Sequence, residues 1–502
     1  MSERLFTALQ ALPDERVLLS GNGQARTAAA LRLDIERLSM RLRQLDANVL
    51  ALLADNGPAW VTADLAALKA GVAQLPLPGF FSDAQLIHAL QSTGADLLLT
   101  DQTARIVGLE LGFREIGAWD GLALLHRQVT PASLPPGTAK ISFTSGSTGQ
   151  PKGVCLSAPG LLDTAEAVSA ALADLPIDRH LSVLPLALLL ENVAGVYAPL
   201  LRGAEVALPK LADMGWRGMA GFDPRQLARQ VETRRPASLI LVPELLKAWT
   251  LALQADNRRA PASLQFVAVG GARCDAALIQ RARAIDLPAF EGYGLTECGS
   301  VVSLNRPGAD QPDSVGRPLR HVRVRVDAGR EIQIESRAFL GYLDTPRIAP
   351  VNRGGEFTTG DLGHLNAAGF LRLSGRRKNL IITAYGRNVA PEWVEAALLA
   401  QPEIAQAVVT GEARPWLAAL LVPAGDVEAA AWATTLAAAV ARANRELPDY
   451  AQVGDWLVRA PFTPANGLAT GNGRPVRAAI LQQHAAAIES LYTDKESAHV
   501  VL

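Results

Sequence analysis

Apolar and polar residues alternate between two patterns in the first hundred positions. Short apolar runs at 49–54 and 97–100 predict buried strands, and apolar residues at helical spacing over 59–69 and 83–91 predict helices. Strands that alternate with helices are typical of a mostly parallel sheet covered by helices. The pattern therefore predicts an α/β fold, with one βαβ-type subdomain in this part of the chain.

The same alternation continues beyond residue 150 and predicts a second βαβ-type subdomain. The elements that we expect here are one helix and three strands, at 160–172, 181–185, 239–242 and 266–269. The last strand is followed at once by Gly270, Gly271 and Ala272. Small residues after a strand let a ligand approach the backbone, and ligands of open α/β sheets bind at strand carboxyl ends. This turn is therefore predicted to form one wall of a ligand site.

The pattern changes again near residue 314. Alternating residues in VRVRV and EIQIES predict antiparallel strands between 314 and 367, and hence a small β-barrel-like subdomain. The end of the chain predicts strands at 407–409 and 417–422 and helices at 427–445 and 475–491. We therefore predict a large N-terminal domain over 1–377 and a small α+β C-terminal domain over 378–502.

Composition excludes several classes of protein. The chain has 502 residues, 49% hydrophobic and 19% charged, which is typical of a globular protein with more than one domain. A net charge of -1 argues against nucleic acid as a partner, because duplex binding usually shows as a clustered basic excess and no such cluster appears in the sequence. The three cysteines have no CxxC spacing, so neither a zinc site nor a disulfide framework is predicted.

Neither the start of the sequence nor its most apolar run indicates a secreted or membrane protein. The first ten residues, MSERLFTALQ, lack the basic and apolar regions of a secretory signal. The most apolar run, 181–201, contains Pro185, Glu191, Asn192 and Pro199, which disfavours a transmembrane segment. We therefore expect a cytoplasmic location.

One loop carries the clearest chemistry in the sequence. Ser142 to Val154 reads SFTSGSTGQPKGV, in which glycines allow close approach to an anion, hydroxyls donate hydrogen bonds and Lys152 adds positive charge. The loop is not a Walker motif, because Pro151 precedes the lysine and Gly153 follows it. A solvated Gly/Ser linker is the alternative, and the strand-like run before the loop argues against it. The loop is therefore predicted to bind phosphate.

Three later turns have the residues of a nucleotide site. In EGYGLTECGS, Tyr293 could stack on a base, Thr296 could bind a phosphate and Glu297 could hold a metal ion. Asp361, in the TTGDLGHL turn, could accept hydrogen bonds from vicinal sugar hydroxyls. A cationic turn follows at Arg376 to Lys378.

The chain resembles the acyl-adenylating (AMP-forming) superfamily. The resemblance is carried by five motifs in this order: the phosphate loop, the GYGLTE turn, the TGD turn, the GRRKN segment and a terminal Gly-rich basic loop. The resemblance covers nearly the whole sequence. SFTSGSTGQPKGV, LPLALLLENVAG, YGLTECGS and GRNVAPEWVE look most like long-chain fatty acyl-CoA and acyl-ACP synthetases. The resemblance implies an ATP- and Mg²⁺-dependent enzyme that converts a medium- or long-chain fatty acid to acyl-AMP. It would then transfer the acyl group to CoA or to the phosphopantetheine of an acyl carrier protein.

The resemblance also assigns roles to residues. The implied catalytic residues are Thr144, Lys152, Thr296, Glu297 and Arg474, with Glu297 as the metal ligand. The implied ATP-binding residues are Ser145, Gly146, Ser147, Thr148, Gly149, Gly271, Ala272, Tyr293, Gly294, Asp361, Arg376 and Lys378. Thr144 to Thr148 and Lys152 would wrap the β and γ phosphates, and Thr296 would meet the α phosphate. Lys378 matches the hinge about which the family rotates its mobile C-terminal domain.

Two positions depart from the family pattern. The family ends in a T-x-x-G-K-x-x-R pattern, and this chain has Arg474 where that pattern has lysine. The positive charge is kept, but the guanidinium is larger than an ammonium group and planar. The alternative to a ligase is therefore an ATP- or acyl-adenylate-binding protein with little turnover. Many relatives have histidine after LPLA, where this chain has Leu188, and a leucine there favours an aliphatic chain. Whether CoA or a carrier protein accepts the acyl group stays open.

Overall fold

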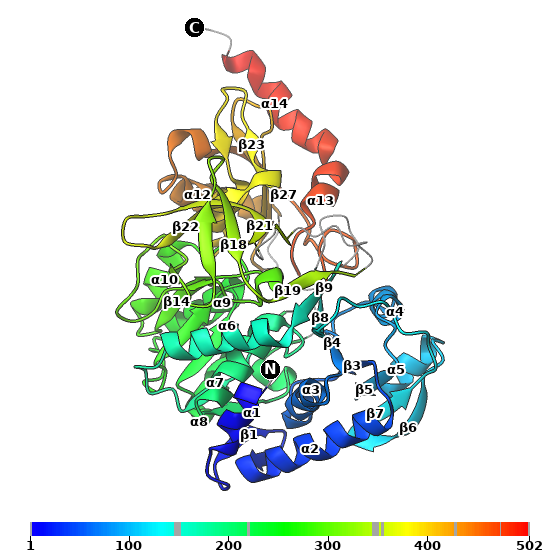
Figure 1. Cartoon of the computed structure of the whole chain (residues 1–502). Helices are drawn as coiled ribbons and strands as arrows, with labels where there is room; N and C mark the ends of the chain where they lie inside the picture. Colours follow the sequence, from blue (N-terminus) through cyan, green and yellow to red (C-terminus); the bar gives the residue numbers. More distant parts are fainter. Residues whose placement is uncertain are drawn as a thin grey trace.

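The computed structural model describes residues 3–144, 152–217, 221–343, 351–352, 356–425, 429–471 and 473–499. Within these residues the strands form two large sheets and three smaller ones. The two large sheets occupy the N-terminal and middle parts of the chain, and the carboxyl-terminal part lies at the opposite end of the molecule from α2 (Figure 1). The predicted α/β organisation is confirmed.

The first large sheet contains the strands that flank the phosphate loop. Its strands, in spatial order, are β19 (Phe339–Tyr342), β9 (Lys152–Ser157), β8 (Thr138–Thr144), β4 (Ala73–Pro76), β3 (Val49–Leu53), β5 (Leu97–Thr100), β7 (Leu122–His126) and β6 (Arg114–Trp119). The strands β8, β4, β3 and β5 run parallel, and those at both edges are antiparallel. The helices of this region are α2 (Ala28–Gln44), α3 (Pro58–Ala70), α4 (Asp83–Ser92) and α5 (Thr103–Gly108). A capping box between Ser82 and Gln85 starts α4.

The second large sheet provides the strand ends that shape the site. Its strands, in spatial order, are β16 (Arg317–Pro318), β15 (Ser303–Leu304), β14 (Ala289–Tyr293), β13 (Phe266–Val269), β12 (Ser238–Leu241), β10 (Arg179–Leu181), β11 (Glu205–Ala207), β1 (Val17–Gly21) and β2 (Gln24–Thr27). The six from β14 to β1 are parallel, so their carboxyl ends share one edge. The helices here are α1 (Glu3–Gln10), α6 (Ala158–Ala171), the π-helix η1 (Glu191–Tyr197), α7 (Ala198–Leu201), α8 (Pro224–Arg234), α9 (Pro243–Ala255) and α10 (Ala276–Arg283).

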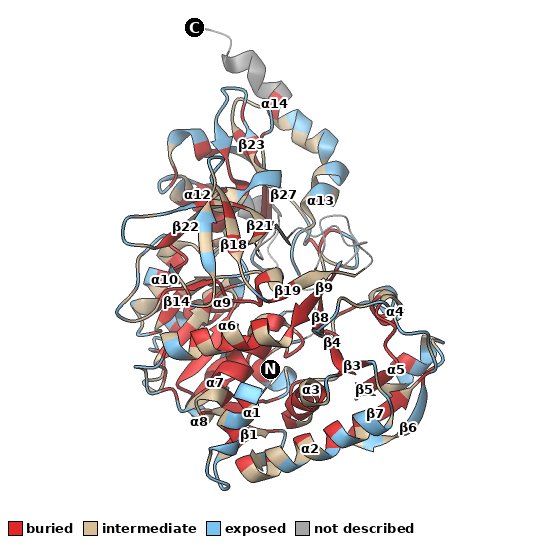
Figure 2. Cartoon of the chain, in the orientation of Figure 1, coloured by how far each residue is buried: buried red, intermediate tan, exposed pale blue. Residues whose placement is uncertain are grey.

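The two large sheets share one hydrophobic core. Helix α3 contacts β3 and β4 of the first sheet and β1 and β2 of the second, and α6 contacts β8, β9 and η1. Trp60 and Tyr197 are each 1% exposed in this core, which shows how completely the layer between the sheets is filled. Buried residues are concentrated in the strands and in the helices between the sheets (Figure 2).

The predicted small β subdomain is a five-stranded antiparallel sheet. It contains β17 (Arg323–Val326), β18 (Glu331–Glu335), β20 (Val351–Asn352), β21 (Glu356–Leu365) and β22 (Leu371–Arg376). Strand β19 from the same stretch instead pairs with β9 of the first large sheet. The prediction that Asp361 lies in a turn is wrong, because the residue is inside β21, opposite Arg376 of β22.

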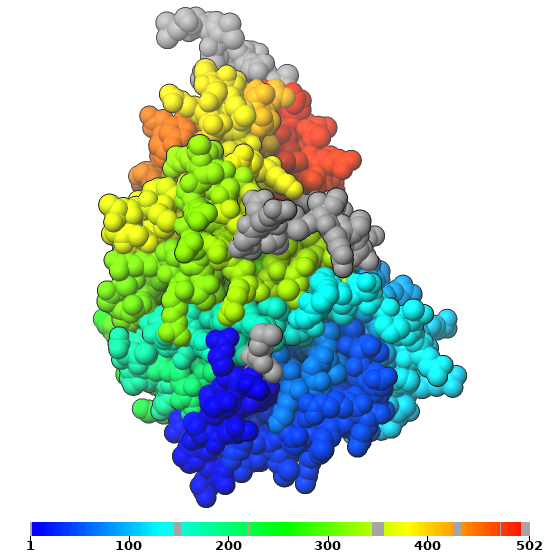
Figure 3. Space-filling model, in the orientation of Figure 1, coloured from blue at the N-terminus to red at the C-terminus, as the bar shows by residue number. Residues whose placement is uncertain are grey.

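The carboxyl-terminal part has its own small core. Its elements are β23 (Ile381–Ile382), β24 (Asn388–Val389), α11 (Pro391–Leu399), β25 (Ile404–Thr410), β26 (Leu417–Pro423), α12 (Ala429–Asn444), β27 (Val453–Val458), α13 (Arg477–Gln483) and α14 (Ala485–His499). Buried side chains of α11, α12 and the sheet of β25, β26 and β27 pack together. In the space-filling view, the carboxyl-terminal part, coloured yellow to red, lies against the green middle of the chain (Figure 3). The division at 377/378 remains a prediction.

Two predicted elements differ from the structure for identifiable reasons. The strand expected at 181–185 is β10, which ends at Leu181, because the Leu184 N–H donates to the Glu191 side chain rather than to a neighbouring strand. The single helix expected at 475–491 is two helices, and the first starts only at Arg477 because Pro475 pairs with Ala469 in a β-bridge. Among the described helices, none is long and apolar enough to span a bilayer.

Candidate active site

A cavity of about 1510 Å³ opens at the carboxyl ends of the parallel strands of the second sheet. Most of the predicted site residues in the described part of the chain line it, namely Thr144, Lys152, Gly271, Ala272, Tyr293, Gly294, Thr296, Glu297, Arg376, Lys378 and Arg474. Asp361 lies behind this lining and is 5% exposed. The predicted loop residues Ser145, Gly146, Ser147, Thr148 and Gly149 lie outside the described residues. The fold thus brings together side chains that are up to about 330 positions apart in the sequence.

The two ends of the phosphate loop face each other. Thr144 at the end of β8 pairs with Lys152 at the start of β9. The Lys152 ammonium lies 5.8 Å from the ring centroid of Tyr342, and the Tyr342 hydroxyl donates a 2.9 Å hydrogen bond to Glu297 Oε1. Burial and the neighbouring carboxylate raise the pKa of Tyr342, so its hydroxyl stays protonated and able to donate. A cation and an anion therefore share this corner of the cavity.

A tight turn holds Thr296 and Glu297 toward the cavity. They belong to the 3₁₀ turn η3 (Thr296–Cys298), which follows β14 directly. A Cβ on Gly294 would lie 1.5 Å from the Ser300 carbonyl oxygen, so the backbone passes itself too closely for any other residue. The Ser300 N–H closes the turn on the Leu295 carbonyl at 3.1 Å.

Asp361 is anchored by two neighbouring side chains. The Tyr293 hydroxyl donates to its Oδ2 at 2.6 Å, and Arg376 Nε donates to its Oδ1 at 2.8 Å. Burial raises the pKa of the Tyr293 hydroxyl, which therefore remains a donor. Each carboxylate oxygen keeps a second lone pair, so the group can still accept hydrogen bonds from a ligand.

Arg474 reaches the cavity from the carboxyl-terminal part. Its loop is closed by a 2.8 Å hydrogen bond from the Thr470 N–H to the Arg474 carbonyl. The Arg474 guanidinium donates to the carbonyl of Gly271, in the turn after β13. Arg477 points elsewhere, because its guanidinium pairs with the Glu395 carboxylate and with the Val409 carbonyl inside the small core. Lys378, in the turn η4 (Arg377–Asn379), is exposed at the cavity.

Two cations that sequence reasoning missed join α9 and α10 to the end of α11. Lys247 Nζ donates to the carbonyls of Gln401 at 2.5 Å and Ile404 at 2.7 Å, and Arg281 donates to the carbonyl of Ala400. Burial lowers the pKa of Lys247 to about 8. The carbonyls of Ala400 and Gln401 follow the carboxyl end of α11, where positive charge is favourable, and Ile404 begins β25. No sequence motif marks either residue.

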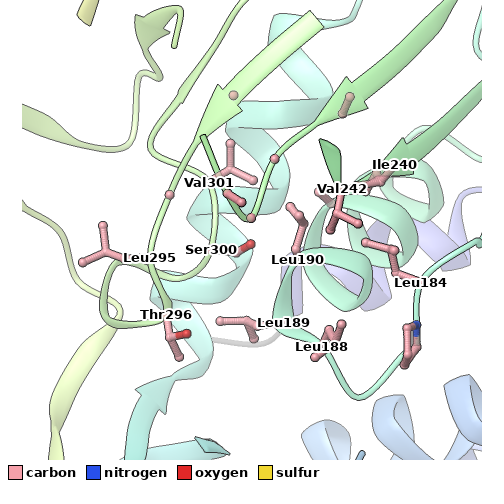
Figure 4. Close-up of a pocket in the computed structure, with 18 of the residues that line it drawn as sticks. Leu184, Leu188, Leu189, Leu190, Ile240, Val242, Leu295, Thr296, Ser300 and Val301 are labelled. Carbon is pink, nitrogen blue, oxygen red and sulfur yellow. The ribbon is translucent and has the colours of Figure 1, made fainter. Parts of the chain in front are cut away.

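An apolar slot leads from the turn at Gly271 into the molecule. One wall is the sheet face made by Val242, Ile240 and Ser238 and, beside them, by Gly270, Ala268 and Phe266. The facing wall carries Leu190, Ala194 and Ala198, which are spaced four apart on η1 and its flanks. In Figure 4, Leu188, Leu189 and Leu190 lie between Thr296 on one side and Leu184 on the other. The predicted position of Leu188 at this pocket agrees with the structure.

Comparisons with known proteins identify two matching family models and several similar enzymes. A family model of AMP-binding enzymes matches residues 5–337, and a model of the AMP-binding enzyme C-terminal domain matches residues 378–496. The 2-succinylbenzoate–CoA ligase of Bacillus velezensis is 30% identical over 55% of this chain and 56% of its own length. The long-chain-fatty-acid–CoA ligase FadD15 of Mycobacterium bovis is 28% identical over 72% of this chain and 70% of its own length.

A solved structure of o-succinylbenzoate CoA synthetase from Bacillus subtilis, in complex with ATP and magnesium ion, has a similar fold. Its TM-score is 0.74 at 23% identity, over 95% of this chain and 98% of that chain. This likeness confirms the predicted large N-terminal and smaller C-terminal domains. Together with the family models and the named relatives, it confirms the predicted resemblance to AMP-forming acyl-CoA synthetases.

Proposed function

The chain belongs to the AMP-binding enzyme family, and we propose that it is an ATP-dependent CoA ligase that activates a medium- or long-chain fatty acid as acyl-AMP. The observation that carries this proposal is the meeting of two environments in one cavity. Lys152, Glu297 and Arg474 supply charged groups at the strand ends, and the apolar slot opens beside Gly271. An amphiphilic acid needs such a site, with its carboxylate at the charged end and its chain in the slot.

The residues at the charged end fit a nucleotide and Mg²⁺. Among the described residues, only Tyr342 bonds the Glu297 carboxylate, and it does so at Oε1. Mg²⁺ is commonly held by one or two carboxylates together with substrate phosphates, so Glu297 could hold it through Oε2. Thr144 and Lys152 stand at the mouth of the phosphate loop, where they would contact the outer phosphates. Asp361, oriented by Tyr293, would accept hydrogen bonds from the ribose.

The protein's contribution to the first half-reaction is mainly electrostatic. The acid's carboxylate must approach the α phosphorus although both groups are negative, and fixed cations reduce this repulsion. Arg474 suits the task, because within the described residues its side chain donates only to the Gly271 carbonyl and a guanidinium has further N–H groups to offer an anion. Mg²⁺, when bound, would supply further neutralisation.

The slot supports an aliphatic substrate. The walls on β12, β13 and η1 are mostly leucine, isoleucine, valine and alanine and carry no lysine or arginine. Arg202, one turn beyond Ala198, also lines the cavity, and its guanidinium donates to the carbonyls of Leu172 and Leu175. 2-Succinylbenzoate, named in several relatives, is a dicarboxylate, whereas FadD15 is named for long-chain fatty acids. The proposal of a fatty acid rests on this difference in chemistry.

Pyrophosphate release tests the proposal. The purified protein would be given ATP, Mg²⁺ and single acids, namely fatty acids of increasing length and 2-succinylbenzoate, and the products with CoA or a phosphopantetheinylated carrier protein would be identified by mass spectrometry. We expect release and acyl-CoA formation with fatty acids. The absence of pyrophosphate release with every acid tested would favour the binding-protein alternative. Release with 2-succinylbenzoate alone would refute the fatty acid, and exclusive loading of the carrier protein would refute CoA as acceptor.

A matched pair of variants separates site chemistry from general damage. Lys152→Ala should reduce pyrophosphate release by about 10²-fold, a usual effect of removing one group that stabilises transition-state charge. Lys69→Ala removes a lysine at the end of α3 that pairs with Glu36 outside the cavity lining, and it should leave the rate unchanged. Equal rates in the two variants would argue against a phosphate at Lys152.

A further inference from the structure

A half-buried lysine joins the wall of the slot to the carboxyl-terminal part. Lys247 lies on α9, the helix that follows Val242, and its Nζ donates to the Gln401 carbonyl at 2.5 Å and to the Ile404 carbonyl at 2.7 Å. These two acceptors belong to the turn between α11 and β25, and Ile404 is the first residue of β25. The ammonium group therefore fixes the start of β25 relative to the wall of the slot.

The turn between α11 and β25 is held from other sides as well. Arg281 of α10 donates to the Ala400 carbonyl. Arg442 of α12 donates to the Gln401 side chain at 2.9 Å and to the Glu403 carboxylate at 2.6 Å. Hydrogen-bonded networks and regular elements of this kind move as a unit. A displacement at Lys247 is therefore passed on to β25 rather than absorbed within the turn.

Gln406, the third residue of β25, continues the connection along the edge of the cavity. Its Nε2 donates to the Phe462 carbonyl at 3.0 Å, and its Oε1 accepts from the Phe462 N–H at 2.8 Å. Both residues line the cavity, and Phe462 is only 2% exposed. Two bonds between one side-chain amide and both backbone groups of a residue fix the position and the direction of the chain there.

The segment after Phe462 carries the cation of the cavity. The Thr463 carbonyl accepts a hydrogen bond from the Leu468 N–H at 3.1 Å. The chain then enters the closed loop of Arg474, whose guanidinium donates to the Gly271 carbonyl. A series of hydrogen bonds and short backbone segments therefore runs from α9 to Arg474 and returns to the strand-end side of the cavity.

From these contacts we infer that Lys247 and Gln406 are positioning residues for the first half-reaction, which hold Arg474 where the acid's carboxylate meets the α phosphate. The inference rests on the proposed function. Lys247 acts on backbone carbonyls and Gln406 on the backbone of Phe462, so both affect the reaction through Arg474. The second half-reaction starts from acyl-AMP, in which the two anions are already joined, and needs this cation much less. Loss of either positioning residue should therefore slow the two half-reactions unequally.

Measuring the two half-reactions separately tests the inference. Lys247→Met and Gln406→Leu keep the length or bulk of the side chain and remove its hydrogen bonds. With the fatty acid that the wild type activates fastest, each should lower pyrophosphate release about tenfold, because small misplacements of a group at the reacting atoms are costly. Each should change acyl-CoA formation from the supplied acyl-AMP by less than about twofold, and Lys247→Arg, which keeps a cationic donor, should recover most of the lost rate.

Combination with Arg474→Ala shows whether the effect passes through that arginine. Neither Lys247→Met nor Gln406→Leu should slow pyrophosphate release further in Arg474→Ala, because no guanidinium is left to position. Gln254 provides the control, since it is exposed on α9 and outside the cavity lining, and Gln254→Leu should alter neither half-reaction. Equal losses in both half-reactions, no loss in either, or losses that add to that of Arg474→Ala would overturn the inference.

Hydrogen exchange of the unliganded protein separates this inference from the proposed function. In Lys247→Met and Gln406→Leu, peptides that cover the Arg474 loop should exchange faster than in the wild type and in Gln254→Leu, because the loop is held less firmly at the cavity. Unchanged exchange would overturn the inference whatever the activity. Faster exchange, in a protein whose wild type releases no pyrophosphate with any acid, would support the positioning of Arg474 and refute the proposed ligase activity.

Discussion

Ala268 controls how deep an acyl chain can enter the slot. It is paired with Ile240, halfway between Val242 and Ser238, and unlike its neighbours Val267 and Val269 it is partly accessible. A leucine at this position would fill the slot about two strand residues below the turn, or about 7 Å in. That depth holds about six carbons, so Ala268→Leu should exclude the outer four carbons of a ten-carbon acid.

The expected loss follows from the buried methylene groups. At about 0.8 kcal/mol for each buried CH₂, four methylenes amount to about 3 kcal/mol, or about 200-fold in kcat/KM at 1.4 kcal/mol for each tenfold. The assay is pyrophosphate release with acids of increasing length, expressed as the ratio of variant to wild-type kcat/KM. The ratio should stay near one up to about six carbons and fall steeply beyond.

Val267→Ile is the control for this substitution, because Val267 is on the same strand but packs on the opposite side of the sheet, in the core formed with α9 and α10. It should leave the rates unchanged or lower them by the same factor for all acids. If Ala268→Leu also changed the rates by one common factor, or if it used ten-carbon acids as well as the wild type does, the acyl chain would not lie in this slot.

Three further predictions concern the cavity edge and the stability of the fold. Arg474→Lys should keep or raise the adenylation rate, since one cation replaces another, while Arg474→Ala should lower pyrophosphate release about 10²-fold; loss of activity in the lysine variant would show that charge alone is insufficient. Gly294→Ala should cost about 3 kcal/mol of stability or more in thermal melts, because its Cβ would meet the Ser300 carbonyl, whereas Gly108→Ala, with open space around its Cβ, should be nearly neutral. Burial lowers the pKa of His321 to about 4, below its usual 6.5, so its contribution to stability is present above pH 6.5 and is lost as the pH falls toward 4. Between pH 7 and pH 4, the free energy of unfolding of His321→Gln, measured by chemical denaturation, should therefore fall by up to about 3 kcal/mol less than that of the wild type. The same fall in both proteins would contradict the assignment.

The sequence alone determined the fold class, the family and most of the charged and polar residues at the strand-end side of the cavity. Continuous apolar runs such as Leu97–Thr100 and Phe266–Val269 match β5 and β13 residue for residue, because a strand buried on both faces needs no polar position. The phosphate loop and the GYGLTE turn were identifiable because each packs its chemistry into a few consecutive residues. The Gly294 backbone contact explains why that turn has so distinctive a sequence.

Only the tertiary structure decided which distant residues meet. Whether Asp361 sits in a turn or a strand depended on its pairing with β22, and the bond between Arg474 and Gly271 joins residues 203 positions apart. His180, Glu191 and Ser238 carry no motif, and each alone is a common buried residue. Their alignment beside the cavity arises from the register of β10 with β12 and from the contact between Glu191 of η1 and His180. Local sequence determines such elements, but long-range strand pairing and helix packing determine which side chains they bring together.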